Sequence, residues 1–303
     1  MIVRVLFAAV IVGVLVLAAA HNAKQLRHVH LDLSLRWLLV AAPFTFVGGV
    51  LLPLAWRHTV GAYGSELPRA TAVRVWSISQ ASRFVPGNVA LVASRVLLSA
   101  REGVPRSLAG ASLGIEGGLI IVWGAFFASW LPSTWLPAPL RLLLAGGALV
   151  VLVAMPVLLR LGGRLVPRFP ALAPEALRVR HLYEAIGLYG VNNLVRASGF
   201  LFVTASLHTI APRDAWLVIG AVNLGAIIGM IGITPAGLGV REGVIAVLLA
   251  HRFGAGNAAA FAVAFRAWDF AFELLWIGIA LTWERRSRAT RSEVVEVAPS
   301  DVP

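Results

Sequence analysis

Charged side chains occur inside segments of this chain that are otherwise apolar enough to cross a lipid bilayer. A charge at the bilayer centre costs at least about 2.5–3.5 kcal/mol on insertion scales, so each one marks a candidate functional site. Guanidinium and carboxylate groups there can pair with each other, receive a charged headgroup or exchange protons. The charged or amide positions are Glu116; Asn192, Asn193 and Arg196; Arg241 and Glu242; and Arg266, Asp269 and Glu273.

The last of these groups has the most informative spacing. Separations of three and four residues place Arg266, Asp269 and Glu273 on one face of a helix. Arg266 and Asp269 can pair within that helix, which leaves Glu273 with Arg196 or Arg241 as candidate partners. Two interpretations stay open: an ion-pair network that fixes helix packing, or a polar cavity that receives a charged group.

Composition explains why these charges are unusual. Of 303 residues, 59% are hydrophobic and 13% charged, against about a quarter charged in soluble domains. The apolar residues form blocks of about 20, the length of a membrane-spanning helix. Because helices satisfy their own backbone hydrogen bonds in lipid, an all-α polytopic membrane protein is expected. The net charge of +12 lies mainly in loops between these blocks, which argues against nucleic acid as a partner.

The apolar blocks predict about eight spans in one integral membrane domain, residues 1–285, followed by a disordered cytoplasmic tail, 286–303. The first block could be a cleaved signal peptide, but we expect a retained helix because further spans follow. The expected spans are 2–20, 37–56, 108–131, 140–160, 184–206, 215–232, 238–251 and 257–283.

Arginine placement predicts the orientation. Five arginines lie between residues 160 and 180, whereas the loop at 132–139 carries no charge. The positive-inside rule therefore places 160–180 and both termini in the cytoplasm, against the opposing signal of Lys24, Arg27 and Arg36. The arginine, alanine and glycine bias suggests a bacterial plasma membrane.

Two Pro/Gly breaks interrupt the helical pattern. Pro86 and Gly87 divide the segment 57–106, and Pro235, Gly237 and Gly239 precede the short segment 238–251. Proline removes a backbone donor and glycine loosens a helix, so each break separates two short helices. Breaks in both halves of a chain indicate a transporter site built from re-entrant elements. An amphipathic surface segment is the alternative for 57–106.

Both breaks resemble motifs of one family. RFVPGNV (residues 83–89), with Arg95 following, is similar to the "R/K-aromatic-hydrophobic-P-G" motif of the lysylphosphatidylglycerol synthase membrane-region family. TPAGLGVREG (residues 234–243) looks like its second motif, "P-x-G-L-G-x-x-E-G". Two departures are that Ala236 replaces a common glycine and that Glu116 is followed by two glycines instead of an arginine.

The resemblance implies a stand-alone flippase-like bundle with two re-entrant elements. It implies a lipid flippase or translocator that moves an anionic or amino-acylated headgroup between leaflets. The headgroup-binding residues expected from the motifs and the buried charges are Arg83, Arg95, Glu116, Arg196, Arg241 and Glu242. An anionic group would suit helix N-termini facing a cavity, with Arg241 beside one of them.

Other classes of function have less support in the sequence. No catalytic motif occurs, and the aminoacyl-transferase domain of full synthases is absent from the chain. His21, His28, His30 and His58 lie near expected membrane ends and not at ligand spacing, so neither a metal nor a cofactor is expected. Membrane lipids are the expected partners. The alternative is a non-transporting accessory subunit that recruits a glycosyltransferase or lipid synthase.

Overall fold

A computed structural model describes residues 33–84, 89–165, 172–231, 237 and 239–296. Its described residues are helical or in loops and turns, without a strand. The expected first span, 2–20, and the break residues Pro86, Gly87 and Pro235 lie outside the described residues. The helices are α3 (Leu35–Gly61), α4 (Arg69–Gln80), η1 (Ala81–Phe84), α5 (Val89–Arg101), α6 (Arg106–Ala128), α7 (Ala138–Leu165), η3 (Pro174–Ala176), α8 (Val179–Ala205), η4 (Pro212–Asp214), α9 (Ala215–Ile231), α10 (Val240–Phe253) and α11 (Ala255–Glu296).

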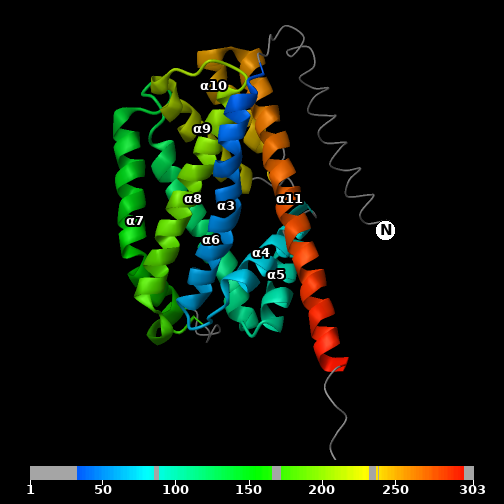
Figure 1. Ribbon diagram of the computed structural model, residues 1–303. Helices are drawn as coiled ribbons and strands as arrows, with labels where there is room; N and C mark the ends of the chain where they lie inside the picture. Colours follow the sequence, from blue (N-terminus) through cyan, green and yellow to red (C-terminus); the bar gives the residue numbers. More distant parts are fainter. Residues whose placement is uncertain (1–32, 85–88, 166–171, 232–236, 238, 297–303) are drawn as a thin grey trace, which may run out of the picture.

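Long helices α3, α6, α7, α8 and α11 run along the bundle, and short helices fill its two ends (Figure 1). Helix α3 packs against α8 from end to end. At one end the Ser34 amide donates to the Ser206 carbonyl at 2.8 Å, and at the other the Arg178 amide donates to the Ala62 carbonyl at 2.7 Å. These two bonds fix the ends of the central helix pair.

Helices α4 and α5 form a short hairpin at the end of the bundle where α3 ends (Figure 1). Helices α9 and α10 form a second hairpin at the opposite end. Small residues allow the second hairpin to close: a Cβ on Gly225 would lie 3.0 Å from Ile245 Cγ1, and one on Gly229 would lie 3.0 Å from Arg241 Cβ. The two hairpins thus approach the middle of the bundle from its two ends.

Local sequence explains where the short helices begin. Pro68 precedes α4 and Pro105 precedes α6, and proline is favoured at a helix start, where its missing amide hydrogen would have no helical partner. Helix α10 begins after Gly239, whose φ of +80° suits glycine. The Gly239 amide donates to Glu242 Oε2 at 2.7 Å, so Glu242 caps the first turn of α10.

Four helical segments among the described residues are long and apolar enough to span a membrane: Leu35–Gly61, Arg106–Ala128, Ala138–Leu165 and Pro212–Ile231. Helix α7 shows a lipid-facing surface, with Leu142 74% exposed and Val153 69% exposed. Side chains of this kind are stable in hydrocarbon and unfavourable in water.

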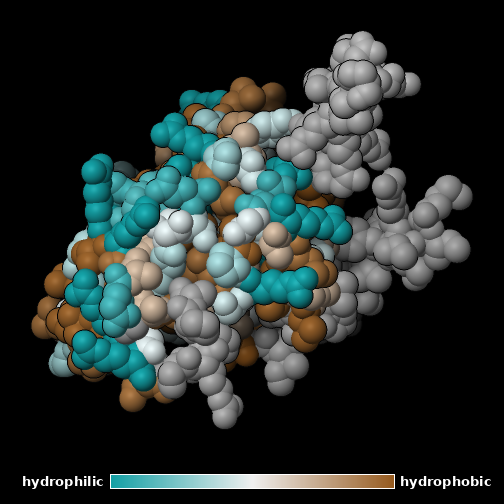
Figure 2. Space-filling view, turned by 90° about the horizontal axis from the view of Figure 1, so that it is seen from below, coloured by the Kyte–Doolittle hydropathy of each residue, from teal (hydrophilic) through white to brown (hydrophobic). Residues whose placement is uncertain are grey.

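Polar residues gather instead at the end of the bundle formed by the α4–α5 hairpin and the ends of α3 and α8. Figure 2 shows this end from below, with hydrophilic residues across the face and hydrophobic ones mainly towards its edges. The chain is therefore a multi-pass membrane protein with a polar end.

One feature differs from the expectations. Residues 286–296 of the expected disordered tail continue α11, since no proline or glycine interrupts that stretch. In α9, the amide of buried Asn223 donates to the Ile219 carbonyl of its own helix at 2.9 Å.

Candidate functional site: two buried charge clusters

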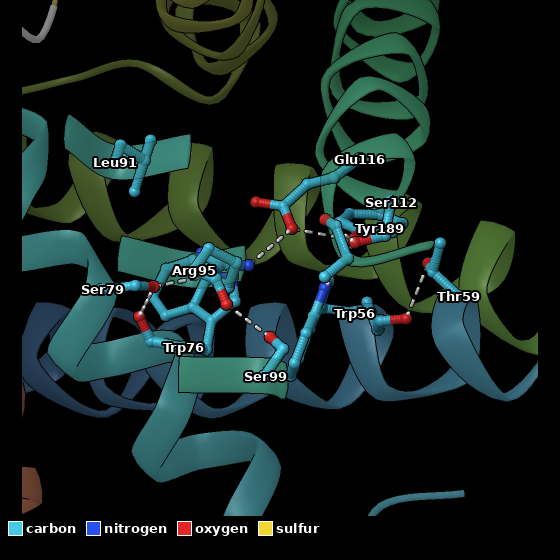
Figure 3. A network of polar contacts seen from close by, with 12 residues as sticks. Trp56, Thr59, Trp76, Ser79, Leu91, Arg95, Ser99, Ser112, Glu116 and Tyr189 are labelled. Carbon is cyan, nitrogen blue, oxygen red and sulfur yellow. Dashed lines mark hydrogen bonds and ion pairs between the residues drawn. The ribbon is translucent and has the colours of Figure 1, made fainter. Parts of the chain in front are cut away.

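Arg95 and Glu116 form a buried ion pair between α5 and α6, with Arg95 Nη1 3.4 Å from Glu116 Oε2. The side chain of Arg95 is 0% exposed and that of Glu116 is 10% exposed. The Tyr189 hydroxyl donates to the same carboxylate oxygen at 3.3 Å, and Arg95 Nε donates to Ser79 Oγ. We call Arg95 and Glu116 the sealed pair (Figure 3).

Aromatic rings surround the sealed pair. The Arg95 guanidinium carbon lies 5.1 Å from the ring centroid of Trp56 and 5.3 Å from that of Trp76. The indole nitrogen of Trp56 in turn donates to Ser112 Oγ at 2.9 Å. A guanidinium held between indole faces gains cation–π attraction, which offsets part of its desolvation. The sealed pair joins α5, α6 and α8 and touches α3 and α4 through these rings (Figure 3).

The second cluster lies on α8, α10 and α11. Asp269 pairs with Arg196 at 2.5 Å and with Arg241 at 3.5 Å, while Arg266 Nε lies 3.7 Å from Glu242 Oε1. We call these five residues the cavity network. Its carboxylates come from two helices and its arginines from three, so it holds the start of α10 against α8 and α11.

A partly open cavity of about 60 Å³ adjoins the cavity network. This volume has room for several water molecules or one phosphate-sized group. The cavity lies between α3, α4, α8 and α11. Its polar or charged lining residues are Thr45, Trp76, Ser77, Gln80, Arg196, Asp269, Glu273 and Trp276.

Three buried donors at this cavity lack a hydrogen-bond partner among the described residues: Trp76 Nε1, Ser77 Oγ and Trp276 Nε1. A buried polar atom without a partner costs about 1–3 kcal/mol, so such groups mark a place for water or a ligand. An indole N–H can only donate. The vacant partner must therefore be a hydrogen-bond acceptor, and Arg196 beside it favours an acceptor with negative charge.

Two glycines of α3 make space for this site. A Cβ on Gly48 would lie 2.8 Å from Arg196 Cγ, and one on Gly49 would lie 1.8 Å from Trp276 Nε1. Both distances are below the 3.0 Å that real Cβ atoms require. The glycine pair thus lets the guanidinium of Arg196 and the indole of Trp276 lie against the backbone of α3.

The expected site residues are therefore divided between two places. Arg95 and Glu116 form the sealed pair, and neither lines the cavity, whereas Arg196 lines it directly. Arg241 and Glu242 contribute through the cavity network. Arg83 lies in η1, the short turn that follows α4.

The expected pairing in α11 needs correction. Arg196 and Arg241 were candidate partners of Glu273, but the structure pairs both with Asp269. Arg266 was expected to pair with Asp269, and its side chain extends to Glu242. One helix face fixes which side chains share a direction, but the neighbouring helices determine which partner each one meets.

Sequence reasoning missed the uncharged part of the cavity, above all Trp76, Ser77 and Trp276. A signal was present. Helix α4 carries Ser77, Ser79 and Gln80 immediately before a Pro/Gly break, and α3 carries two adjacent glycines in mid-helix. The polar residues of α4 indicate that its inner end faces polar groups. The glycine pair of α3 indicates that a large side chain lies against its backbone.

One family model covers most of the chain. The model of the family described as the lysylphosphatidylglycerol synthase TM region matches residues 1–277. The match includes both hairpins, the sealed pair and the cavity network. A search of curated proteins found no match for the chain.

Proposed function

Because the chain belongs to the lysylphosphatidylglycerol synthase TM region family, we propose that it moves the headgroup of an anionic or amino-acylated lipid between bilayer leaflets. The observation that carries this proposal is the cavity of about 60 Å³, with Arg196 and three donors around it that lack a partner among the described residues. A lipid phosphate supplies the acceptor oxygens that these donors lack. Its acyl chains would remain in the hydrocarbon while the headgroup passes through protein.

The charges around the cavity favour a headgroup of mixed sign. Arg196 and the two indole N–H groups suit a phosphate, since guanidinium geometry matches phosphate oxygens. Asp269 and Glu273 line the same cavity and would favour an amine close to that phosphate. An amino-acylated phospholipid carries both groups, whereas a headgroup with phosphate alone would use only the arginine side of the cavity.

The arrangement of the hairpins supports a path by which a lipid headgroup reaches the cavity from either leaflet. We infer that α4–α5 and α9–α10 are re-entrant hairpins, which enter from opposite leaflets, within a bundle whose complete spans include α3, α6, α7, α8 and α11. Gln80 near the inner end of α4 and Asp269, which pairs with Arg241 at the start of α10, line the same cavity. A headgroup at this cavity would lie at the junction of both hairpins, as in transporters with broken helices.

The polar end in Figure 2 would face the cytoplasm, because α7 ends there with Arg160 and Arg164, and α8 begins there with Arg178 and Arg180. This orientation places the α4–α5 hairpin on the cytoplasmic side and α9–α10 on the outer side. The membrane in question would be the plasma membrane of a bacterium. The lipids of that membrane would then surround the protein and also be the molecules that it transports.

The test is exchange of a fluorescent phospholipid between leaflets of proteoliposomes, with dithionite quenching of the outer leaflet. In protein-free vesicles, dithionite quenches only the half of the label that lies in the outer leaflet. With the native protein, we expect it to quench more than half of a labelled phosphatidylglycerol or lysyl-phosphatidylglycerol. Equal exposure with and without protein, for anionic, amino-acylated and polyprenyl-linked lipids alike, would overturn the proposal. The accessory-subunit interpretation would then take its place.

A further inference from the structure

Two histidines and a glutamate converge at the polar end of the bundle, away from the cavity. His58 comes from the last turn of α3, and His181 and Glu184 come from the first two turns of α8. His58 Nδ1 lies 2.9 Å from Glu184 Oε2, and His181 Nδ1 lies 3.3 Å from the same oxygen. The two Nδ1 atoms are 3.4 Å apart. Three potential ligand atoms therefore form a compact triangle.

The size of this triangle matches one face of a metal tetrahedron. Zinc binds imidazole nitrogen and carboxylate oxygen at about 2.0–2.2 Å, which in a tetrahedron places neighbouring ligand atoms about 3.3–3.6 Å apart. The three separations of 2.9, 3.3 and 3.4 Å come within a few tenths of an ångström of those edges. We propose that His58, His181 and Glu184 bind a divalent transition-metal ion of the zinc class.

The chemistry of the three groups supports a cation at their centre. Imidazole nitrogen and carboxylate oxygen are ligands that zinc prefers. Without a cation, two Nδ1 atoms face each other and one shared oxygen. If both carried protons, the N–H groups would oppose each other, and if one did not, its lone pair would face the lone pairs of the Glu184 oxygen. A metal ion satisfies all three lone pairs at once.

Neighbouring groups hold the carboxylate in the required orientation. Arg180 Nε lies 3.0 Å from Glu184 Oε1, the oxygen that does not face the histidines. Partners of this kind orient a metal ligand and affect its affinity. Arg57, next to His58 in the chain, donates to the Leu67 carbonyl and so is directed towards the adjoining loop.

The site is preformed and can be reached from solvent. The hydrogen bond from the Arg178 amide to the Ala62 carbonyl already holds this end of α3 against α8. The side chains of His58, His181 and Glu184 are 21%, 31% and 33% exposed. Three protein ligands leave the fourth position of a tetrahedron for a solvent oxygen. The bound ion would clamp α3 to α8 at the polar end.

The test is a cobalt titration of the purified, untagged protein in detergent, followed by visible absorption. His28 and His30 form a separate His-x-His pair, so both are replaced by alanine in the parent protein. We expect one equivalent of Co²⁺ to give the intense visible bands of a four-coordinate site, and one equivalent of Zn²⁺ to displace it.

Variants assign the site. His181→Ala and Glu184→Gln should each weaken cobalt binding by at least about 100-fold. This loss exceeds the loss expected when the replaced residue only orients a metal ligand. His251→Ala, at the opposite end of the bundle, should bind like the parent. The melting midpoint without metal checks that each variant is folded, and only the parent and His251→Ala should gain stability from Zn²⁺. Absence of cobalt bands in the parent, or unchanged affinity in folded His181→Ala, would overturn the proposal.

Discussion

The sealed pair and the cavity network use the same chemistry, arginine against carboxylate, in different surroundings. Arg95 is fully buried and lies against two indole rings and a serine, and its carboxylate also accepts a bond from Tyr189. Arg196 pairs with Asp269 beside a cavity whose nearby donors lack partners among the described residues. Among the described residues, one donor of the sealed pair, Arg95 Nη2, lacks a hydrogen-bond partner, whereas three donors at the cavity lack one and have space beside them.

This difference separates two roles for charge in a membrane protein. A buried pair surrounded by packed side chains holds helices together, and it gives no space for another group. A pair beside unpaired donors and a cavity can exchange part of its interactions for those of a ligand. We therefore assign the sealed pair to the attachment of the α4–α5 hairpin and the cavity network to the headgroup.

The largest expected effect comes from breaking the sealed pair. Glu116→Ala leaves the Arg95 guanidinium buried without its carboxylate, which should cost about 3–5 kcal/mol of unfolding free energy. Replacing both partners in Arg95→Met/Glu116→Leu should recover most of that stability, because no unpaired charge remains. Unfolding by SDS titration in mixed micelles measures both. A double variant that is no more stable than Glu116→Ala would show that the charges do more than hold the hairpin.

Removing the cavity arginine should affect binding more than stability. Arg196→Ala takes away a charge-assisted bond to the headgroup, worth about 1.5–3 kcal/mol, or about tenfold or more in affinity. Asp269 keeps Arg241 as a partner, so the fold should remain. Calorimetric titration with short-chain phosphatidylglycerol measures the affinity, with Arg252→Ala at the far end of α10 as the control. Equal affinity in native protein and Arg196→Ala would contradict the assignment.

A substitution in the glycine pair of α3 tests by steric change alone whether the cavity binds the headgroup. Gly49→Ala places a methyl group where the Trp276 indole now lies, so the ring must move towards the cavity. We expect headgroup affinity to fall by about threefold to tenfold, within the range of one neutral hydrogen bond. Gly114→Ala is the matched control, since a Cβ there meets no atom within 4 Å. Both variants are measured in the same titration, and a similar loss in both would rule out the steric argument.

The smallest effect is expected at the cap of α10. Glu242→Ala removes the acceptor for the Gly239 amide and the partner of Arg266, and a lost cap costs about 0.5–2 kcal/mol. Glu242→Gln keeps an acceptor oxygen and should lose less. Hydrogen exchange of the first amides of α10 measures the stability of this first turn in both variants. Equally fast exchange in Glu242→Gln and in Glu242→Ala would show that charge, and not capping, holds the helix start.

Much of the fold follows from the sequence, because apolar block length and Pro/Gly breaks act locally. The division of residues 57–106 into two short helices around residues 86–87 agrees with α4, η1 and α5. The count of eight spans is not established, since the structure identifies four segments as candidate spans. Of the two expected spans 215–232 and 238–251, the first corresponds to the candidate span Pro212–Ile231, whereas α10 has only 14 residues and is not among the candidates.

The candidate site was only partly predictable for a related reason. Buried charges stand out against an apolar background, so Arg196 and Asp269 could be found from composition alone. Trp76 and Trp276 could not, since a tryptophan in a membrane helix usually faces the interface or the core. His58 and Glu184 are 126 positions apart in the chain, and their meeting depends entirely on the packing of α3 against α8.

The central claim is that the cavity network carries the headgroup and the sealed pair does not. Lipid exchange in proteoliposomes tests it most directly when native protein, Arg196→Ala and Arg95→Met/Glu116→Leu are reconstituted at equal density. The account predicts exchange near the native rate for the double variant and exchange at the protein-free level for folded Arg196→Ala. Native exchange in Arg196→Ala, together with loss of exchange in a stably folded double variant, would contradict it.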